Sequence, residues 1–335
     1  MLSKALIILA FNKGTIPRHI WEQYYGQPTK KYTKITNNTK PTVSSNFFLL
    51  SSNFVDLRDR VIYCFNINGI KLLHSLCTYT NITSSEDGGC IKFSGNSFIV
   101  QDRFCATKCY SPISGMFSIT WLAQGTIENK NFVNLGSLYQ CGHDNTGNSS
   151  IDHSFGYKTL ISTNITETRC KNFAGYDFYY NTVIINFCCF ISNDNHESNP
   201  VCMRHWDTPD SFVKKSIFKN NTAKIYNSDH GLLSCQGSNV TVSECIFLQN
   251  KADHAFSVSS SGTITVINCT GDDLTASIYF FGTVNTDKMK TDSFNITLSL
   301  FKSGECEAEN PISYDSIELI STQKFKWRKI YRYRG

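Results

Sequence analysis

A pair of neighbouring carboxylates, Asp272 and Asp273, has the residue type needed for acid and base catalysis. A glycoside hydrolase holds two carboxyl groups at a defined separation on either side of the bond that it cleaves. Neighbouring residues of a strand point to opposite faces, so these two side chains would not meet over one substrate. We therefore expect a polar turn at this position and no catalytic residue.

A second group has the residue types of a zinc site. A zinc ion takes four cysteine or histidine ligands in a tetrahedron, and five such residues fall within 188–205: Cys188, Cys189, His196, Cys202 and His205. Cys188 occupies a repeated position whose side chain we expect to point into the core. We therefore expect no metal and no cofactor. Four further histidines stand isolated and are expected on the surface or hydrogen-bonded in the core: His74, His143, His153 and His254.

The tail at 324–335, KFKWRKIYRYRG, is the third group, with six Lys or Arg and no acid. Without it the chain has 26 basic and 27 acidic residues, so the basicity belongs to the tail. As a strand, the tail would carry aromatic side chains on one face and basic ones on the other. It could cover an exposed sheet edge, or bind anionic partners such as acidic glycans or phospholipid headgroups. The body lacks a basic stripe, so we expect no nucleic-acid binding.

The elements that must position these residues are strands. The chain is long enough, at 335 residues with 41% apolar content, to bury a large core. It contains 24 Phe and 16 Tyr, which favour strands, and no long stretch has the Ala, Leu, Glu and Lys pattern of a helix. These features predict an all-β protein.

One sequence unit recurs along the chain. CIFLQN at 245–250, SIFKNN at 216–221 and CCFISN at 188–193 share a small residue, a Phe two residues later and an Asn three further on. An Ile or Val precedes the small residue by three. Followed in both directions, the Ile or Val positions are Ile99, Ile127, Ile165, Ile185, Val213, Val242, Val266 and Ile296. The Phe positions are Phe104, Phe132, Phe190, Phe218, Phe247 and Phe301, with Cys170 and Gly271 at the two remaining places.

The unit predicts two short strands with a bend between them. Val240 and Val242 alternate with Thr241, as in a strand with one buried face. Cys245 and Phe247 alternate on the other parity, so both pairs point inward only if the chain bends at 243–244. The Asn that ends the unit in the three opening copies then marks a second turn, because Asn tolerates the left-handed conformation.

A repeat of this length, with strands, bends and a polar loop, is one coil of a solenoid. Stacked coils place like residues on like and so build one continuous core. We predict a right-handed parallel β-helix of about 8–10 coils over residues 61–310. Residues 1–60 would form a less regular N-terminal cap or leader, and 311–335 a C-terminal cap with the tail. A β-sandwich or propeller, the alternative, would not explain the Ile and Val spacing.

The architecture resembles the pectin-lyase-like superfamily over residues 70–305. GGCIKFSGNSFIVQDRF at 88–104 and the coils after it look like the large β-helix surface-protein families of parasitic protists. Adhesion is the usual supposition for those families. The resemblance implies a non-enzymatic extracellular or surface protein with a ligand-binding or adhesive face, and glycans or a cell-surface protein as partner classes.

The same superfamily includes polysaccharide hydrolases and lyases, so a carbohydrate-active enzyme is the alternative. Asp229, His230 and Gly231 are similar to the His-Gly element of polygalacturonases. In that family the paired Asp precedes this element, whereas Asp272 and Asp273 follow it here. The family's Arg-Ile-Lys element is missing, as is an acidic calcium cluster of the pectate-lyase kind. The sequence therefore favours a protein without enzymatic activity.

Fourteen cysteines and eight N-x-S/T sequences favour an extracellular or cell-surface location. The candidate glycosylation sites are Asn37, Asn81, Asn148, Asn164, Asn220, Asn239, Asn268 and Asn295. Residues 1–11 could be a weak signal sequence or a first strand. No apolar run is long enough for a membrane span. Cys245 and Cys269 fall at the same repeat position, so they could form a disulfide or stack as thiols.

Overall fold

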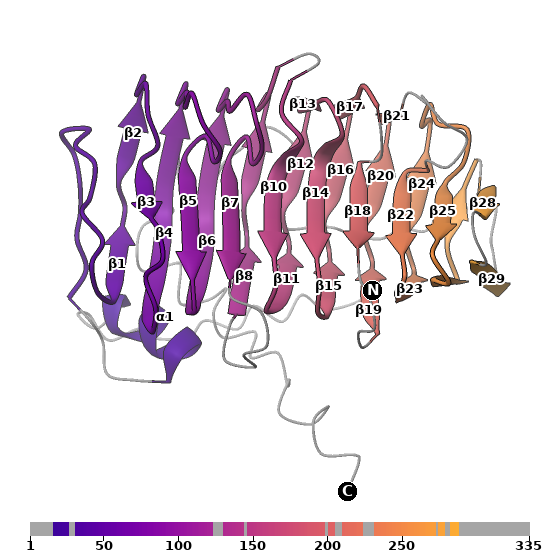
Figure 1. Ribbon diagram of the computed structural model, residues 1–335, viewed down its shortest axis with the longest axis horizontal. Helices are drawn as coiled ribbons and strands as arrows, with labels where there is room; N and C mark the ends of the chain where they lie inside the picture. The colour runs from indigo at the N-terminus through magenta and orange to yellow at the C-terminus, as the bar shows by residue number, and fades with distance from the viewer. Residues whose placement is uncertain are drawn as a thin grey trace, which may run out of the picture.

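The strands of the protein wind into a parallel β-solenoid of about 7 turns (Figure 1). The computed structural model describes residues 16–26, 31–122, 130–143, 146–197, 200–204, 210–223, 231–272, 274–278 and 282–287. Each pairing between the described strands is parallel, which excludes the antiparallel sandwich and confirms the predicted fold class. The solenoid has about 7 turns, fewer than the predicted 8–10 coils, and its last described strand, β29 (Thr283–Asp287), pairs with β26 (Thr263–Ile267) of the large sheet.

Three parallel sheets form the walls. The large sheet contains β1 (Phe47–Leu50), β2 (Asn53–Val55), β4 (Ile70–Thr80), β6 (Ser97–Thr107), β8 (Lys130–Asn134), β9 (Ser137–Tyr139), β11 (Tyr157–Ile161), β12 (Asn164–Thr166), β15 (Val183–Asn186), β16 (Cys189–Ile191), β19 (Ser211–Lys214), β20 (Ile217–Lys219), β23 (Asn239–Ser243), β24 (Ile246–Leu248), β26 (Thr263–Ile267), β27 (Thr270–Gly271) and β29. The second sheet contains β3 (Ile62–Cys64), β5 (Ile91–Gly95), β7 (Ser118–Leu122), β10 (Ser149–Ser154), β14 (Phe173–Tyr179), β18 (Val201–Arg204), β22 (Leu233–Gln236), β25 (Phe256–Ser259) and β28 (Ala276–Ile278). The third contains β13 (Arg169–Cys170), β17 (Asp194–Asn195) and β21 (Thr222–Ala223).

The predicted bend within the large sheet is present. Glu244 adopts a left-handed backbone with φ 54°, and Cys245 then points inward. The Cys245 thiol donates to the carbonyl of Ser243, two residues earlier, at 3.3 Å. Ser216 does the same one coil before, with its hydroxyl 2.9 Å from the Lys214 carbonyl. Each of these carbonyls also accepts a backbone N–H of the preceding coil, Ser243 from Lys215 and Lys214 from Phe187, so the small side chain adds a second, local hydrogen bond at the bend.

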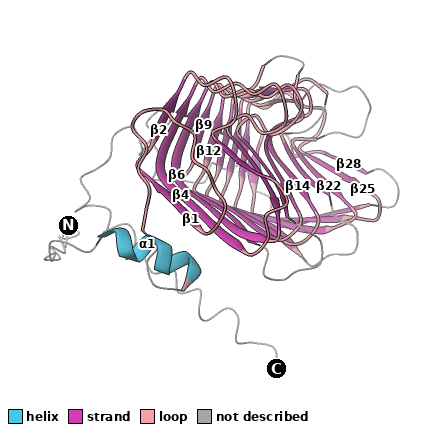
Figure 2. Cartoon of the chain, turned by 60° about the vertical axis from the view of Figure 1, so that its left-hand side comes forward, coloured by secondary structure: helices cyan, strands magenta, loops and turns pink. Residues whose placement is uncertain are grey.

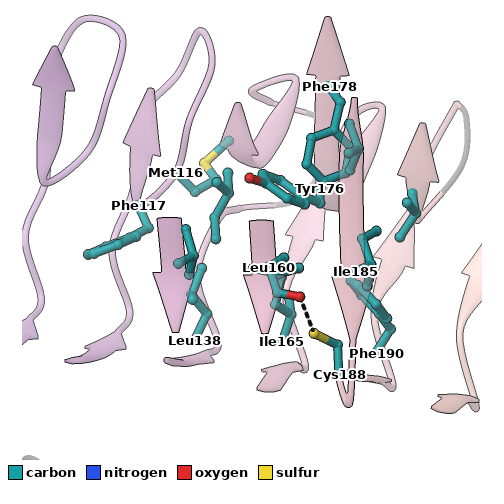
Figure 3. Close-up of a cluster of buried hydrophobic side chains, with 14 of the residues drawn as sticks. Met116, Phe117, Leu138, Leu160, Ile165, Tyr176, Phe178, Ile185, Cys188 and Phe190 are labelled. Carbon is teal, nitrogen blue, oxygen red and sulfur yellow. Dashed lines mark hydrogen bonds between the residues drawn. The ribbon is translucent and has the colours of Figure 1, made fainter. Parts of the chain in front are cut away.

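The apolar columns of the later coils also match the prediction. Val213 pairs with Val242, and Val242 with Val266, and all three are fully buried. Phe218 stacks on the rings of Phe190 and Phe247, with ring centroids 4.9 Å and 4.8 Å apart. This is the strand spacing of a sheet, so each coil contributes one ring to a continuous column. Figure 3 shows how such side chains fill the interior around Phe190 and Ile185.

The predicted columns are wrong in the earlier coils. Ile165 pairs with Phe190 and so belongs to the Phe column. The residue beside Ile185 in that coil is Leu160, and the next coil back places Val133 there. Leu160 can take this place because a buried column requires apolar volume and not one residue type.

Phe132, Phe104 and Ile99 depart from their predicted positions too. Phe132 points outward and is only half-buried. Phe104 pairs with Cys77 at the small-residue position, and its ring fills the space beside Gly136, where a Cβ would lie 2.6 Å from it. Ile99 is buried, but it pairs with Leu72 in a neighbouring column. Ile127, Ile296 and Phe301 lie outside the described residues.

The turn predicted at the Asn that ends each repeat unit is present, but the Asn does not adopt the left-handed conformation predicted for it. The left-handed residue is the one before each Asn, namely Ser192, Asn220 and Gln249. The asparagines themselves form a ladder, buried at Asn193 and Asn221 and half-buried at Asn250. Each amide donates to a carbonyl of the preceding coil: Asn193 to Ile165, Asn221 to Phe190 and Asn250 to Phe218, at 2.8–2.9 Å. Their side chains therefore stabilise the turn by hydrogen bonds.

The described part of the N-terminal region adds two strands to the large sheet and one helix to its outer face. β1 and β2 pair in register with β4, so the sheet already includes part of the segment expected to be a cap. Helix α1 (Ile16–Tyr25) packs on the outer face of the large sheet (Figure 2). Trp21 and Tyr25 of α1 cover Phe48, Leu73 and Val100 there. Among the described residues, no helix is long and apolar enough to cross a membrane.

Candidate binding surface

The outer face of the second sheet exposes three aromatic side chains near its N-terminal end. Tyr63 and Phe65, at the end of β3, are each 53% exposed, and Trp121 of β7 is 42% exposed. The inward positions between and beside them are Cys64 and Thr120, which are buried. Because side chains alternate along a strand, a buried inner position places its neighbours outside. Isolated surface aromatics are common, but three on two strands that are separated by β5 alone mark a candidate interaction site.

The strand register places two of these aromatics in one row. Cys64 pairs with Phe93, and Ser94 pairs with Trp121. Cys64, Phe93 and Thr120 are paired across the three strands, and Phe65 and Trp121 directly follow the two outer members, on either side of the buried Ser94. With strands about 4.8 Å apart, Phe65 and Trp121 are separated by about 10 Å along the solenoid axis.

Two cations hold the aromatics in place. The Arg60 guanidinium lies 4.4 Å from the Tyr63 ring centre, and its Nη2 is 2.7 Å from Glu86. The Lys92 ammonium lies 5.4 Å from the Trp121 ring and 3.3 Å from Asp87. Each cation therefore contacts a ring and a carboxylate together.

Three ion pairs lie on the described part of this face. The cations Lys40, Arg60 and Lys92 are each within 4 Å of a carboxylate. The carboxylates are Asp59, Glu86 and Asp87, so each cation named here is balanced by an anion. We call Tyr63, Phe65, Trp121, Arg60, Lys92 and Ser94 the aromatic face. Its flat rings, bordered by hydrogen-bonding groups, suit a ligand with both apolar and hydroxyl-bearing surfaces.

Sequence reasoning missed the aromatic face. Its signal was an aromatic residue on each side of an inward cysteine, at Tyr63 and Phe65, and a Trp after an inward Thr. Residues 63 and 121 are far apart in the chain, so only the coil lengths bring them together.

A cluster with catalytic residue types lies beneath helix α1. The Asp102 carboxylate accepts hydrogen bonds from Tyr24 at 3.0 Å, Ser75 at 2.9 Å and Asn134 at 2.9 Å, and Arg103 Nε lies 3.5 Å away. Burial, then the Asp102 charge, raises the pKa of Tyr24. Asp102 is only 1% exposed, so no substrate reaches it. The cluster attaches α1 to the sheet.

A second polar network lies inside the solenoid. His153 contacts the Tyr176 hydroxyl through Nδ1 and the Gln101 amide through Nε2, at 3.4 Å for the amide. His74 contacts the Tyr79 hydroxyl at 3.2 Å. Burial lowers the pKa of His74 to about 3 and lowers that of His153 as well. These histidines are neutral, hydrogen-bonded core residues, one of the two positions expected for them.

Lys158 is also fully buried, between Asn131 and Val183 in the sheet register. Its ammonium donates to the carbonyls of Gly156 at 3.1 Å and Tyr179 at 2.8 Å, and also to that of Tyr180. Burial lowers its pKa, and the Asp152 charge opposes that effect. Lys158 therefore bridges the carbonyls of two neighbouring coils, and the Tyr179 carbonyl also accepts the Phe155 backbone N–H at 2.8 Å.

The residues whose types could serve catalysis or zinc binding were expected to do neither, and several of them lie outside the described residues. Asp272 is exposed and accepts the Gln249 backbone N–H, while Asp229, His230 and Asp273 lie outside the described residues. Cys188 points inward and donates to the Leu160 carbonyl at 3.3 Å (Figure 3), and Cys189 faces the other way. The side chains of Cys202 and His205 are not described. Among the described side chains, no group of three or more His, Cys, Asp or Glu is placed to hold a metal ion.

The candidate glycosylation sites differ in exposure. Five are exposed, namely Asn37, Asn81, Asn148, Asn220 and Asn239. Asn268 is half-buried, and Asn295 lies outside the described residues. Asn164 is buried, so the folded chain does not present its amide to solvent.

Most described cysteines are buried thiols. Cys245 and Cys269 are both free, and the Cys245 backbone N–H lies 3.4 Å from the Cys269 sulfur. Of the two arrangements expected for this pair, the structure has stacked thiols. Cys105, which faces away from the core, is disulfide-bonded.

Comparison of the chain with protein-family models, with curated proteins and with solved structures gave no match.

Proposed function

We propose that this protein is a non-enzymatic, extracellular or cell-surface β-helix protein that binds a ligand through the aromatic face. The observation that carries the proposal is the row formed by Phe65 and Trp121, two exposed aromatics on a rigid sheet. Exposed aromatic side chains are costly to keep in water and are enriched where proteins bind partners. The resemblance to the pectin-lyase-like superfamily and to protist surface proteins supports the same function.

Binding without catalysis fits the groups present on this face. Arg60 and Lys92 are engaged by carboxylates, and Glu86 and Asp87 are engaged by those cations. A general acid or base must be within hydrogen-bonding reach of the substrate and must exchange a proton. Groups held in ion pairs with fixed charge serve orientation instead.

Binding of the purified chain to a glycan array and to intact cells tests the proposal. Trp121→Ala and Phe65→Ala are expected to abolish most of the binding, because each removes one ring of the row. Tyr139→Ala is the matched control, since Tyr139 is an exposed aromatic on the large sheet. Equal binding by all three variants and the unaltered chain would remove the aromatic face as the site. Circular dichroism of each variant verifies that the solenoid is intact.

A further inference from the structure

We infer that the aromatic face binds a neutral, linear polysaccharide whose chain runs along the solenoid axis across β3, β5 and β7. This inference rests on the proposed function and specifies its ligand class. Three features of the face lead to it: the line of the rings, their spacing and the pairing of its charges.

The line of the rings selects a linear ligand. Phe65 and Trp121 follow the paired residues Cys64 and Thr120 on the outer two strands, and the buried Ser94 leaves no tall side chain between them. Tyr63 lies two residues before Phe65 on the same strand, about 7 Å to the side of the row. A narrow chain can therefore rest on both rings, with Tyr63 along its flank.

The spacing of the rings selects a sugar polymer. The C–H faces of a pyranose ring pack against aromatic rings by burying apolar surface, while the hydroxyls at the ring edge remain available for hydrogen bonds. A separation of about 10 Å between Phe65 and Trp121 is close to the length of a disaccharide. Alternate sugars of one chain can then stack on the two rings, and the intervening sugar passes over Ser94.

The charges of the face select against an acidic polymer. A uronate or sulfate would need an unpaired cation, but Arg60 and Lys92 lie beside Glu86 and Asp87. Their side chains are also only 10% and 13% exposed. A ligand anion would approach those two carboxylates as closely as the cations, so attraction and repulsion would offset each other. Uncharged sugars meet no such opposition.

Calorimetric titration with hexasaccharides tests the inference. The neutral probes are hexamers of β-1,4-linked glucose, mannose and N-acetylglucosamine, and the acidic probe is a galacturonic acid hexamer. At least one neutral hexamer is expected to bind, with a Kd at least about tenfold lower than that of the acidic probe. Trp121→Ala and Phe65→Ala are each expected to raise that Kd about tenfold or more, and Trp121→Phe and Tyr139→Ala to raise it less than about threefold.

Chain length gives a second readout. The matching disaccharide cannot cover both rings, so it should bind at least about tenfold more weakly than the hexamer to the unaltered chain. In Phe65→Ala, which keeps one ring, this advantage of the hexamer should largely disappear.

The outcomes separate the two proposals. Tighter binding of the acidic hexamer would overturn the neutral ligand, while loss of that binding in Trp121→Ala would retain the aromatic face as the site. The acidic hexamer could instead bind as tightly to Trp121→Ala as to the unaltered chain and fail to bind a chain that ends at residue 323. That result would assign the binding of the acidic hexamer to the basic tail. If no hexamer binds, the inference fails, and the cell-binding assay above then decides whether the face binds anything.

Discussion

Asn221 and Asn250 lie one above the other on successive coils and are joined by two hydrogen bonds. The Asn250 side-chain oxygen accepts both the backbone N–H and the side-chain amide of Asn221, each at 3.0 Å. The Asn221 amide also reaches the carbonyl of Phe190 at 2.8 Å. One side chain thus satisfies groups on the coils before and after its own.

Asn221→Ala should reduce the free energy of unfolding by about 2–4 kcal/mol, because it leaves buried backbone groups without partners. Urea denaturation followed by circular dichroism measures the change. Asn239→Ala, an exposed substitution on β23, is the control and should cost less than about 0.5 kcal/mol. Equal losses in the two variants would contradict the structural role of the ladder.

The buried histidines should make the fold acid-sensitive. The pKa of His74 is near 6.5 in the unfolded chain and about 3 in the folded one, so the unfolded state binds its proton first. Stability from this residue is therefore present above about pH 6.5 and lost as the pH falls toward 3, by up to about 1.4 kcal/mol per pH unit. His74→Gln should flatten the dependence of unfolding free energy on pH over that window.

His143→Gln is the matched control for this experiment, because His143 is exposed. Its curve should follow that of the unaltered chain. A His74→Gln curve with the original slope would mean that other groups cause the loss in acid.

The contact between Tyr24 and Asp102 should hold helix α1 in place. Tyr24→Phe removes the hydroxyl from a buried carboxylate without changing the packing volume, and it should cost about 1.5–3 kcal/mol. Hydrogen exchange should show faster opening of 20–25 with little change in β15 or β19. Tyr32→Phe alters an exposed tyrosine and serves as the control. A uniform loss of protection from hydrogen exchange along the chain would contradict a contact that stabilises helix α1 alone.

The buried thiols should be unreactive in the folded protein. Burial raises the pKa of Cys64 and of Cys77 to about 12, so neither carries thiolate at neutral pH. Iodoacetamide at neutral pH, followed by peptide mapping, should label these cysteines only after denaturation. Labelling of Cys245 and Cys269 after denaturation without reductant would agree with stacked thiols. If both stayed unlabelled until reduction, they would form a disulfide.

Peptide mapping of protein from its native cell tests the proposed location. A secreted chain should carry glycans at exposed sites such as Asn220 and Asn239 and none at Asn164, which is buried. Bare asparagines at all exposed sites would argue against passage through the secretory pathway. A glycan attached to Asn164 would contradict the buried position of this side chain in the folded protein.

The later coils were predictable because each repeats one local rule. A Val, a bend, a small residue and a Phe recur with little change from Ile185 to Val266, so like residues stack. The earlier coils break that rule. The column that contains Ile185 holds Leu160 and Val133 before it, then Gln101 and His74, and polar residues give no apolar signal.

The amino-acid sequence alone determined that the chain is a parallel solenoid and where the later coils bend, because both follow from short-range periodicity. It also placed the small residues that complete those bends. Only the tertiary structure decided that His74, Gln101 and Lys158 are buried and that Phe65 and Trp121 share a row. Strand register depends on the length of every intervening turn, and a slip of one residue exchanges the inner and outer faces of a strand.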